Sequence, residues 1–258
     1  MQDPDTSAGA DPPSGRLQLP SLCEVCRRWG RARLCSACLQ RFAPSVPRCS
    51  RCGLRLGASA SQCGACMRQP PPYTRTVCAV DYQFPWDGLI TAFKFRNQPE
   101  LALPLARCMA AAVQVGAATH PHPQPRALLP VPLAPARLAQ RGYNQAWELA
   151  RRLGPMLGLP AWSDLLSRPV DTAHQLELSR QQRQRNLRAA FLTEPAQRAR
   201  LQGLHVALVD DVMTTGATVG EAAGELLRAG ASRVDVWVLA RTAEHRNTGQ
   251  PGAAAEGA

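Results

Sequence analysis

The sequence predicts an α/β domain with a mainly parallel sheet, preceded by a small cysteine-rich module. Three observations support this prediction. Eight cysteines form four CxxC pairs between residues 23 and 66. From residue 76 to residue 242, apolar strand-like runs alternate with segments of helical spacing, as in a parallel sheet covered by helices. One predicted strand, residues 203–211, ends in two aspartates that are followed by small hydroxyl residues and glycine.

The composition is that of a globular protein with a basic excess. The 258 residues are 45% hydrophobic and carry a formal net charge of +11. Such an excess fits a nucleic-acid or phosphate partner. However, Lys94 is the only lysine among 30 basic residues, so the many arginines equally fit a bias toward GC-rich codons. Both explanations stay open.

Both ends of the chain are polar. Residues 1–20 lack the apolar core of a secretory signal, and residues 244–258 are poor in large apolar side chains, so we predict a disordered tail at each end. No segment approaches about 18 consecutive apolar residues. We therefore expect a cytoplasmic protein that does not insert into a membrane.

The paired cysteines predict structural zinc. Two CxxC turns complete a tetrahedral shell of four thiolates, which leaves no open position for water. A disulfide framework would instead need an oxidising compartment. We predict a double zinc ribbon over residues 21–70, and an interleaved pairing of the four turns stays open beside the sequential one. In the sequential pairing one ion lies on Cys23, Cys26, Cys35 and Cys38, and the other on Cys49, Cys52, Cys63 and Cys66.

The first half of the α/β domain, predicted over residues 74–243, follows a proline-rich break at residues 69–73. Residues 76–84 are rich in β-formers and predict a strand. Residues 85–88 resemble a turn, and residues 89–96 have helical spacing. Further expected elements are a helix at residues 99–115 with Pro104 as a possible bend, a loop at residues 116–125 and a buried strand at residues 126–133.

The second half continues the alternation. Residues 141–154 predict a helix that begins near Asn144, and residues 164–170 a short strand. Residues 174–191 are polar and rich in arginine, with Ser179 as a candidate N-cap. The last three elements are a buried strand at residues 203–211, a helix at residues 217–230 closed by Gly230, and a strand at residues 233–242.

The loop after the strand at residues 203–211 has the features of a phosphoribosyl site. Backbone N–H groups at the start of the following helix favour an anion, and the threonine hydroxyls add hydrogen-bond donors. The two carboxylates suit sugar hydroxyls or a magnesium ion. The alternative is a helix N-cap cluster without a ligand. The residues concerned are Asp210, Asp211, Thr214, Thr215, Gly216, Ala217 and Thr218.

Residues 206–218, VALVDDVMTTGAT, resemble the phosphoribosyl-pyrophosphate loop of type I phosphoribosyltransferases. The resemblance implies that Asp210 and Asp211 contact the ribose hydroxyls and that residues 214–218 surround the 5-phosphate. The CxxC pairs, FKFR, LLPVPL, RGYNQA and QLELSRQQRQRNL follow in an order that resembles the ComF family. This family joins a double zinc ribbon to a phosphoribosyltransferase domain. The resemblance covers about residues 22–242 and implies a link to natural competence, the uptake and processing of single-stranded DNA.

Basic residues in these motifs are candidates for holding pyrophosphate, because arginine binds phosphate oxygens bidentately. They are Lys94, Arg96, Arg141, Arg180 and Arg183, of which we assign Arg180 and Arg183 to the catalytic group with Asp210 and Asp211. Residues 175–187 would correspond to a mobile loop that closes over the reacting centre and excludes water. A solvated arginine-rich helix is the alternative for this segment.

Two functions follow as expectations. The first is a phosphoribosyltransferase that binds phosphoribosyl pyrophosphate or a nucleotide with magnesium, with an acceptor that the sequence does not identify. The second is a non-catalytic, ligand-sensing competence factor that binds single-stranded DNA or a competence helicase through its basic ribbons. Structural zinc is expected in both.

Overall fold

A four-stranded parallel sheet is the centre of the structure, a computed structural model that describes residues 20–57, 60–119, 121–169 and 190–243. The strand order is β3-β6-β5-β4. Because all the strands run in the same direction, their carboxyl ends meet at one edge of the sheet. The strands are β3 (Arg75–Asp81), β4 (Ala127–Pro130), β5 (His205–Met213) and β6 (Arg233–Arg241).

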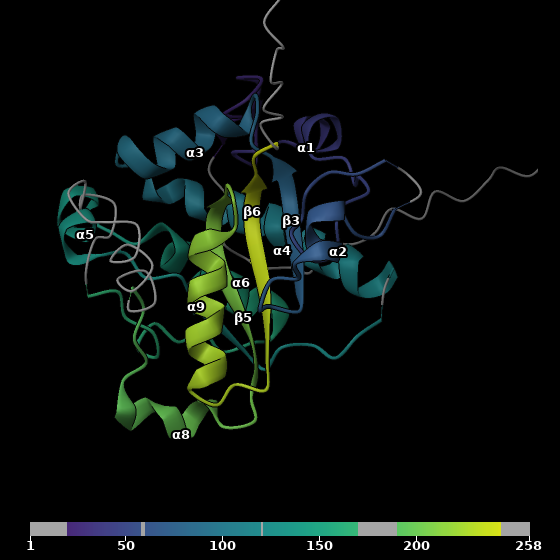
Figure 1. The fold of residues 1–258 in the computed structure, drawn as a ribbon. Coiled ribbons are helices and arrows are strands. Elements are labelled where there is room, and N and C mark those ends of the chain that lie inside the picture. Colours follow the sequence, from purple (N-terminus) through teal and green to yellow (C-terminus); the bar gives the residue numbers. More distant parts are fainter. Residues whose placement is uncertain (1–19, 58–59, 120, 170–189, 244–258) are drawn as a thin grey trace, which may run out of the picture.

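Helices cover both faces of this sheet. One face carries α9 (Ala217–Arg228), and the other carries α4 (Ala102–Thr119) and α6 (Gln145–Leu157) (Figure 1). Side chains alternate along β5, so that Leu208 packs in the cluster beneath α9 and Val209 in the cluster beneath α4 and α6. The sheet with helices on both faces, preceded by cysteine tetrads, confirms the predicted fold class.

The remaining helices connect these layers. The α3 helix leads through η1 into α4, and η3 runs directly into α8. The short α5 helix precedes α6 and was not among the elements expected from the sequence. These elements are α3 (Trp86–Phe95), η1 (Pro99–Leu101), α5 (Pro135–Arg141), η3 (Pro195–Gln197) and α8 (Arg198–Leu201).

Three local predictions were wrong. Residues 85–88 are not a turn, because α3 already begins at Trp86, whose buried indole anchors the first helical turn in the core. Residues 116–119 are not part of a loop, because α4 continues to Thr119. Residues 164–170 do not form a strand, and the described part of this segment makes only an isolated bridge from Ser167 to Leu192.

Two predicted helix ends are confirmed. Asn144 caps α6, and its side-chain oxygen accepts hydrogen bonds from the backbone N–H groups of Ala146 and Trp147. At the other helix, α9 ends at Arg228, and Gly230 follows with a φ of +112°, a conformation that side chains rarely adopt.

The segment Pro99–Thr119 is long and apolar enough to cross a membrane by length and composition alone, with a mean hydropathy of 1.5. In the structure it is a core helix. Its side chains Leu105 and Met109 are buried in the cluster between the sheet and α6. Core helices of this kind pass the same test, so the segment is weak support for a membrane span.

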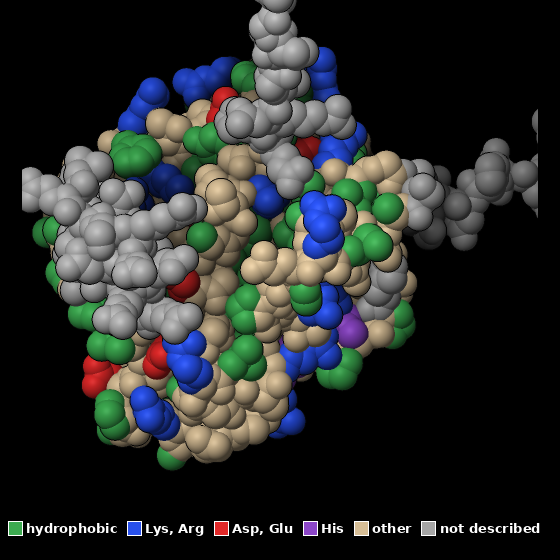
Figure 2. All heavy atoms as spheres, in the orientation of Figure 1, with side chains coloured by type: hydrophobic (Ala, Val, Ile, Leu, Met, Phe, Trp, Pro, Cys, Tyr) green, Lys and Arg blue, Asp and Glu red, His purple; other side chains and the backbone are tan. Residues whose placement is uncertain are grey.

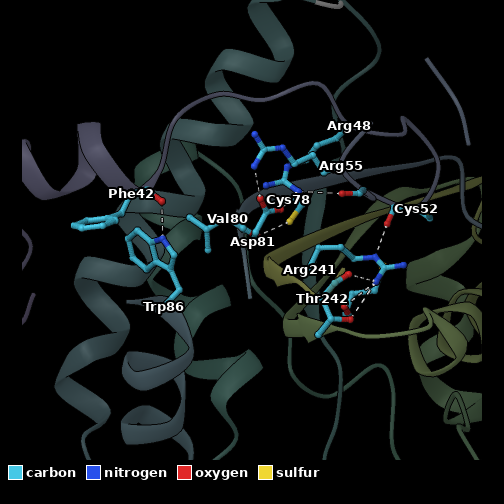
Figure 3. Close-up of polar contacts among 12 residues, drawn as sticks. Phe42, Arg48, Cys52, Arg55, Cys78, Val80, Asp81, Trp86, Arg241 and Thr242 are labelled. Atoms are coloured by element: carbon cyan, nitrogen blue, oxygen red, sulfur yellow. Dashed lines mark hydrogen bonds and ion pairs between the residues drawn. The ribbon is translucent and has the colours of Figure 1, made fainter. Parts of the chain in front are cut away.

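The cysteine-rich segment lies against the α/β domain at two places. The first half contacts α3, where the Trp86 indole N–H donates to the Phe42 carbonyl at 2.7 Å (Figure 3). The second half contacts β3, where Arg48 Nη1 lies 2.6 Å from Asp81 Oδ1 (Figure 3). The short elements of this segment are β1 (Ser21–Leu22), β2 (Trp29–Gly30), α1 (Ser36–Phe42) and α2 (Gly64–Arg68).

Candidate phosphoribosyl and zinc sites

The candidate phosphoribosyl site is the loop that joins β5 to α9 at the carboxyl edge of the sheet. Gly216 precedes α9 with a φ of +84°, the left-handed region that favours glycine. Thr214 and Thr215 are exposed, and the Thr215 hydroxyl accepts the Ala217 N–H at 3.3 Å. The N-cap residue Gly216 has no side chain that could accept a hydrogen bond from α9, and the first helical residues, Ala217 and Thr218, are exposed. The helix therefore presents N–H groups and its positive dipole end to solvent.

The two aspartates differ in their partners. Asp211 has a side chain that is only 8% exposed, and its Oδ1 lies 2.8 Å from Nζ of Lys94. Asp210 accepts the backbone N–H of Asp211 at 2.8 Å. Burial and the adjacent Asp211 carboxylate raise the pKa of Asp210 from 3.8 to about 7, although Lys94 acts in the opposite direction. When both carboxyls are ionised they repel each other, and a bound cation or hydroxyl donors would reduce this repulsion.

The end of α3 brings the predicted basic residues toward this loop. Lys94 reaches Asp211, and its neighbour Phe95 lies beneath the guanidinium of Arg141, 5.0 Å from the ring centroid. Arg141 also donates to the Gln145 side chain at 3.1 Å. The sequence predicted both Lys94 and Arg141 as ligand contacts. In the structure both lie at the carboxyl end of α3, Lys94 as part of the helix and Arg141 over the ring of Phe95. Tyr143 reinforces this arrangement, since its hydroxyl donates to the Phe93 carbonyl.

The rings of Trp86, Tyr143 and Phe95 differ in how far they are available to stack on a base. Trp86 is buried in the core and is not available for stacking. Tyr143 is half-buried and held by Phe93. Phe95 is 66% exposed with Arg141 over one face.

Further residues border the site without a signal in their local sequence. Arg168 acts on the carboxyls of both Asp210 and Glu221 electrostatically, lowering the pKa of each against the effect of burial. Asn144, besides capping α6, donates to the Val131 carbonyl at 3.1 Å and so holds the loop after β4. Tertiary contacts bring these residues to the site, which sequence spacing cannot show. The predicted catalytic residues Arg180 and Arg183 lie outside the described residues.

The eight paired cysteines form two separate tetrads. Within each tetrad the four sulfur atoms lie within 4.8 Å of one another, as the sequential pairing requires and an interleaved pairing does not. Closest sulfur pairs are 3.7 Å apart, between Cys26 and Cys35 and between Cys52 and Cys63. A tetrahedral ion with Zn–S bonds of about 2.3 Å sets sulfurs about 3.8 Å apart, so the donors fit zinc. The two remaining cysteines, Cys78 and Cys108, are buried.

Backbone groups complete these tetrads. The N–H of Cys35 points at the sulfur of Cys23 at 3.5 Å, and the N–H of Cys63 points at the sulfur of Cys49 at 3.3 Å. N–H donors to thiolates stabilise their negative charge and orient them. With four sulfurs each, the tetrads fit closed structural sites.

Comparison with known proteins agrees with this arrangement, although a scan of protein-family models finds no match. The chain is 39% identical to the DNA utilization protein YhgH of Salmonella typhi over 232 residues, 88% of this chain and 99% of that protein. Identity to YhgH of Escherichia coli K12 is 38% with the same coverage. Identity to Competence protein F of Haemophilus influenzae is 38% over 208 residues, 81% of this chain and 90% of that protein.

Solved structures show a weaker likeness. The chain covers 30% of the length of a glutamine phosphoribosylpyrophosphate amidotransferase from B. subtilis, with 57% of this chain aligned, 16% identity and a TM-score of 0.39. For hypoxanthine phosphoribosyltransferase of Trypanosoma cruzi the aligned shares are 61% of this chain and 72% of that chain, with 14% identity and a TM-score of 0.35.

The class of protein is defined by the parallel sheet with helices on both faces, the two aspartates near the end of β5 and the tetrads: an α/β protein with an amino-terminal module of two four-cysteine sites. Identity near 39% over almost the whole length of its relatives shows the family as well. The chain belongs to the ComF family.

Proposed function

We propose that the β5–α9 loop binds the 5-phosphoribosyl group of phosphoribosyl pyrophosphate or of a nucleotide, together with Mg²⁺. One observation carries this proposal: two carboxylates in the last four residues of β5 and the amino end of α9 are joined by a loop of three residues, 214–216. Carboxylates accept hydrogen bonds from vicinal ribose hydroxyls. The N–H groups at the start of α9 and the exposed Thr214 and Thr215 hydroxyls suit a phosphate dianion.

The charges around the loop support the same ligand. Asp210 and Asp211 repel each other, and Lys94 offsets only part of that repulsion. Ribose hydroxyls would donate to these oxygens, and Mg²⁺ shared with the pyrophosphate would lower their repulsion further. Lys94 near the end of α3, and Arg141 at the end of α5 with its guanidinium over Phe95, would face the pyrophosphate oxygens as cations.

In a transfer reaction at this site, the bond from the anomeric carbon to the pyrophosphate oxygen breaks. Pyrophosphate leaves with the electron pair, and a nitrogen of the acceptor forms the new bond to carbon. Positive charge develops on the ribose ring during this step, and the two aspartates beneath it would stabilise that charge through fixed electrostatics. A screen of nucleobases for turnover would identify the acceptor.

Calorimetric titration with phosphoribosyl pyrophosphate and Mg²⁺ tests the proposal. We expect binding to the wild type and a loss of about 100-fold or more in affinity for the double variant Asp210→Asn with Asp211→Asn, because two charge-assisted hydrogen-bond acceptors are weakened. Asp164→Asn is the matched control, since Asp164 is an exposed carboxylate paired with Arg200 at 2.7 Å. Absence of heat with the wild type, or equal affinity in the double variant, would overturn the proposal.

We further propose a role in DNA uptake or utilisation in the cytoplasm, since the relatives are named for DNA utilization and competence. A specific surface favours single-stranded DNA as a second ligand. A groove of about 350 Å³ between the first tetrad and α3 is lined by Arg27, Phe84 and Arg96 among others. Phe84 is 71% exposed, and Arg27 and Arg96 are exposed as well. Aromatic rings beside cations suit unpaired bases and their phosphates.

The charge distribution agrees with such a ligand. Lys and Arg side chains gather toward the upper edge of the molecule and along the side where α2 and β3 lie (Figure 2). Electrostatic binding would fall steeply between about 50 and 200 mM salt. In fluorescence anisotropy with a labelled oligonucleotide, we expect Arg96→Gln to weaken binding and Arg198→Gln, an exposed arginine on α8, to leave it unchanged. An affinity for the oligonucleotide that does not change with salt, or that falls equally in both variants, would count against single-stranded DNA as a ligand of this groove.

A further inference from the structure

The second cysteine tetrad and the candidate phosphate loop share one buried arginine. Arg241 ends β6 and is 5% exposed. Its Nε donates to the Cys52 carbonyl at 3.0 Å, and its Nη1 lies 3.4 Å from the Met213 carbonyl. Figure 3 shows Arg241 reaching from the end of the strand toward Cys52. We infer that Arg241 is a positioning residue that makes the order of the β5–α9 loop depend on the second tetrad.

Met213 is the last residue of β5 and directly precedes the two threonines of the loop. Its carbonyl accepts the Thr242 N–H at 3.1 Å as well as the contact from Arg241. Arg241 Nη1 also donates to the Thr242 carbonyl at 2.8 Å. One guanidinium therefore fixes the start of the loop, the strand end beside it and the CxxC turn at Cys52.

The buried charge of Arg241 needs hydrogen-bond acceptors around it. A guanidinium stays protonated at every physiological pH, and burying it costs much free energy unless acceptors surround it. The hydrogen-bond acceptors that the structure shows are carbonyls and one hydroxyl, of Cys52, Met213 and Thr242. Four thiolates around Zn²⁺ carry a formal net charge of about −2. A filled second tetrad therefore gives Arg241 a nearby negative charge that the carbonyls alone do not.

A second contact runs in parallel. The buried Tyr73 hydroxyl lies 3.1 Å from the position that a Cβ on Gly216 would take. The Tyr73 carbonyl accepts from Nη1 of Arg51 at 3.2 Å, and Arg51 stands inside the CSRC turn. The second tetrad thus supports the loop from below as well as at its start.

The first tetrad makes no comparable contact among the described residues. It reaches the domain through Phe42 and Trp86, and Arg33 pairs with Glu100 at 3.3 Å, all on the side of α3 and η1. The inference therefore concerns one tetrad and not the other. It rests on the proposed function only where ligand affinity is the readout.

Hydrogen–deuterium exchange of the ligand-free, zinc-loaded full chain tests the coupling directly. In Arg241→Gln we expect the amides of residues 214–219 to exchange about tenfold faster, since a hydrogen bond from a charged donor is lost. The matched control is Arg48→Gln: Arg48 directly precedes Cys49 of the same tetrad, and its half-buried contact is to Asp81 and not to the loop. Arg241→Lys keeps the charge and should recover part of the protection. Equal exchange of this segment in wild type and Arg241→Gln would overturn the inference, as would an equal increase in Arg48→Gln.

A second readout uses zinc release. By linkage, a ligand whose affinity is raised by zinc in the second tetrad must raise the zinc affinity of that tetrad by the same factor. At equilibrium with a competing colorimetric chelator, we expect phosphoribosyl pyrophosphate to reduce the transfer of one of the two zinc ions in wild type and in Arg48→Gln, but not in Arg241→Gln. Protection that persists in Arg241→Gln would contradict the inference. If wild type binds no phosphoribosyl pyrophosphate, the proposed function fails, and the exchange experiment alone decides the coupling.

Discussion

The ammonium group of Lys94 lies 2.8 Å from Oδ1 of Asp211, where α3 ends beside the carboxyl end of β5. The backbone N–H of Asp211 donates to the carboxylate of Asp210. Lys94 therefore pairs with one of two adjacent carboxyls and also lowers the pKa of the other. The position of Lys94 therefore influences the pH at which the two carboxyls of the candidate site ionise.

Lys94→Met should shift the pH dependence of ligand binding. Lys94 lowers the pKa of Asp210, so its removal should move that pKa above its present value of about 7. Binding that needs ionised Asp210 will then begin at a higher pH. Calorimetric affinities for phosphoribosyl pyrophosphate, measured from about pH 6 to about pH 9, give the pH midpoint at which the affinity changes. Lys94→Arg is the control that preserves the positive charge. A midpoint that does not move in Lys94→Met would contradict this explanation.

Asp210→Asn should stabilise the protein at alkaline pH. The folded-state pKa of Asp210, about 7, lies above the unfolded value of 3.8, so the folded state holds a proton that the unfolded state has lost. Stability therefore falls as pH rises from about 4 to 7 and is constant beyond. We expect the advantage of Asp210→Asn over wild type to grow by roughly 2 kcal/mol between about pH 5.5 and 8. Denaturant titrations at the two pH values measure this difference in the free energy of unfolding, with Asp164→Asn as the control. A stability difference that does not depend on pH would refute the raised pKa of Asp210.

Gly216→Ala should disturb the loop for two separate reasons. A Cβ would lie 3.1 Å from the Tyr73 hydroxyl, and the φ of +84° costs a non-glycine residue about 1 kcal/mol. The double variant with Tyr73→Phe removes the close contact and leaves the backbone cost. We expect it to recover part of the ligand affinity and melting temperature lost in the single variant. No recovery would mean that the contact with Tyr73 is not what limits the loop.

Metal analysis of the purified chain should give about two zinc ions per molecule, one for each tetrad. Replacing Cys35 and Cys38 by serine, or Cys63 and Cys66, should leave one. Removal of zinc by a chelator should lower the melting temperature, since metal binding contributes to the folding of such modules. Intact protein that binds no zinc, or that holds its cysteines as disulfides, would refute the closed-site interpretation.

Much of the site was predictable because its signals are local. The alternation of apolar runs and the acidic end of the strand over residues 203–211 predicted β5 and the residues after it. Spacing predicted two four-cysteine sites but left the sequential and the interleaved pairing open, and the structure shows the sequential one. Asn144 was recognisable as a helix start from its position before the periodic residues of α6.

What could not be predicted depends on tertiary contacts. Trp86 resembles part of a turn because Pro85 and Gly88 surround it, but its burial against the first tetrad makes it the start of a helix. Tyr73 belongs to a proline-rich break in the sequence, yet it packs beneath Gly216. Arg241 resembles any arginine at a strand end until the position of Cys52 is known. Contacts of this kind leave no pattern in the sequence.

The position of the second tetrad has a consequence for solubility. In the sheet, β3 is an outer strand, and its Thr76 N–H donates to the Ser50 carbonyl while the Thr76 hydroxyl donates to the Arg51 carbonyl. Outer strands with free backbone groups invite pairing with other chains and aggregation. The cysteine module occupies one of these backbone groups and lies along this outer strand. We predict that unfolding of the module, for example after removal of bound zinc, would expose the edge of the sheet and favour aggregation.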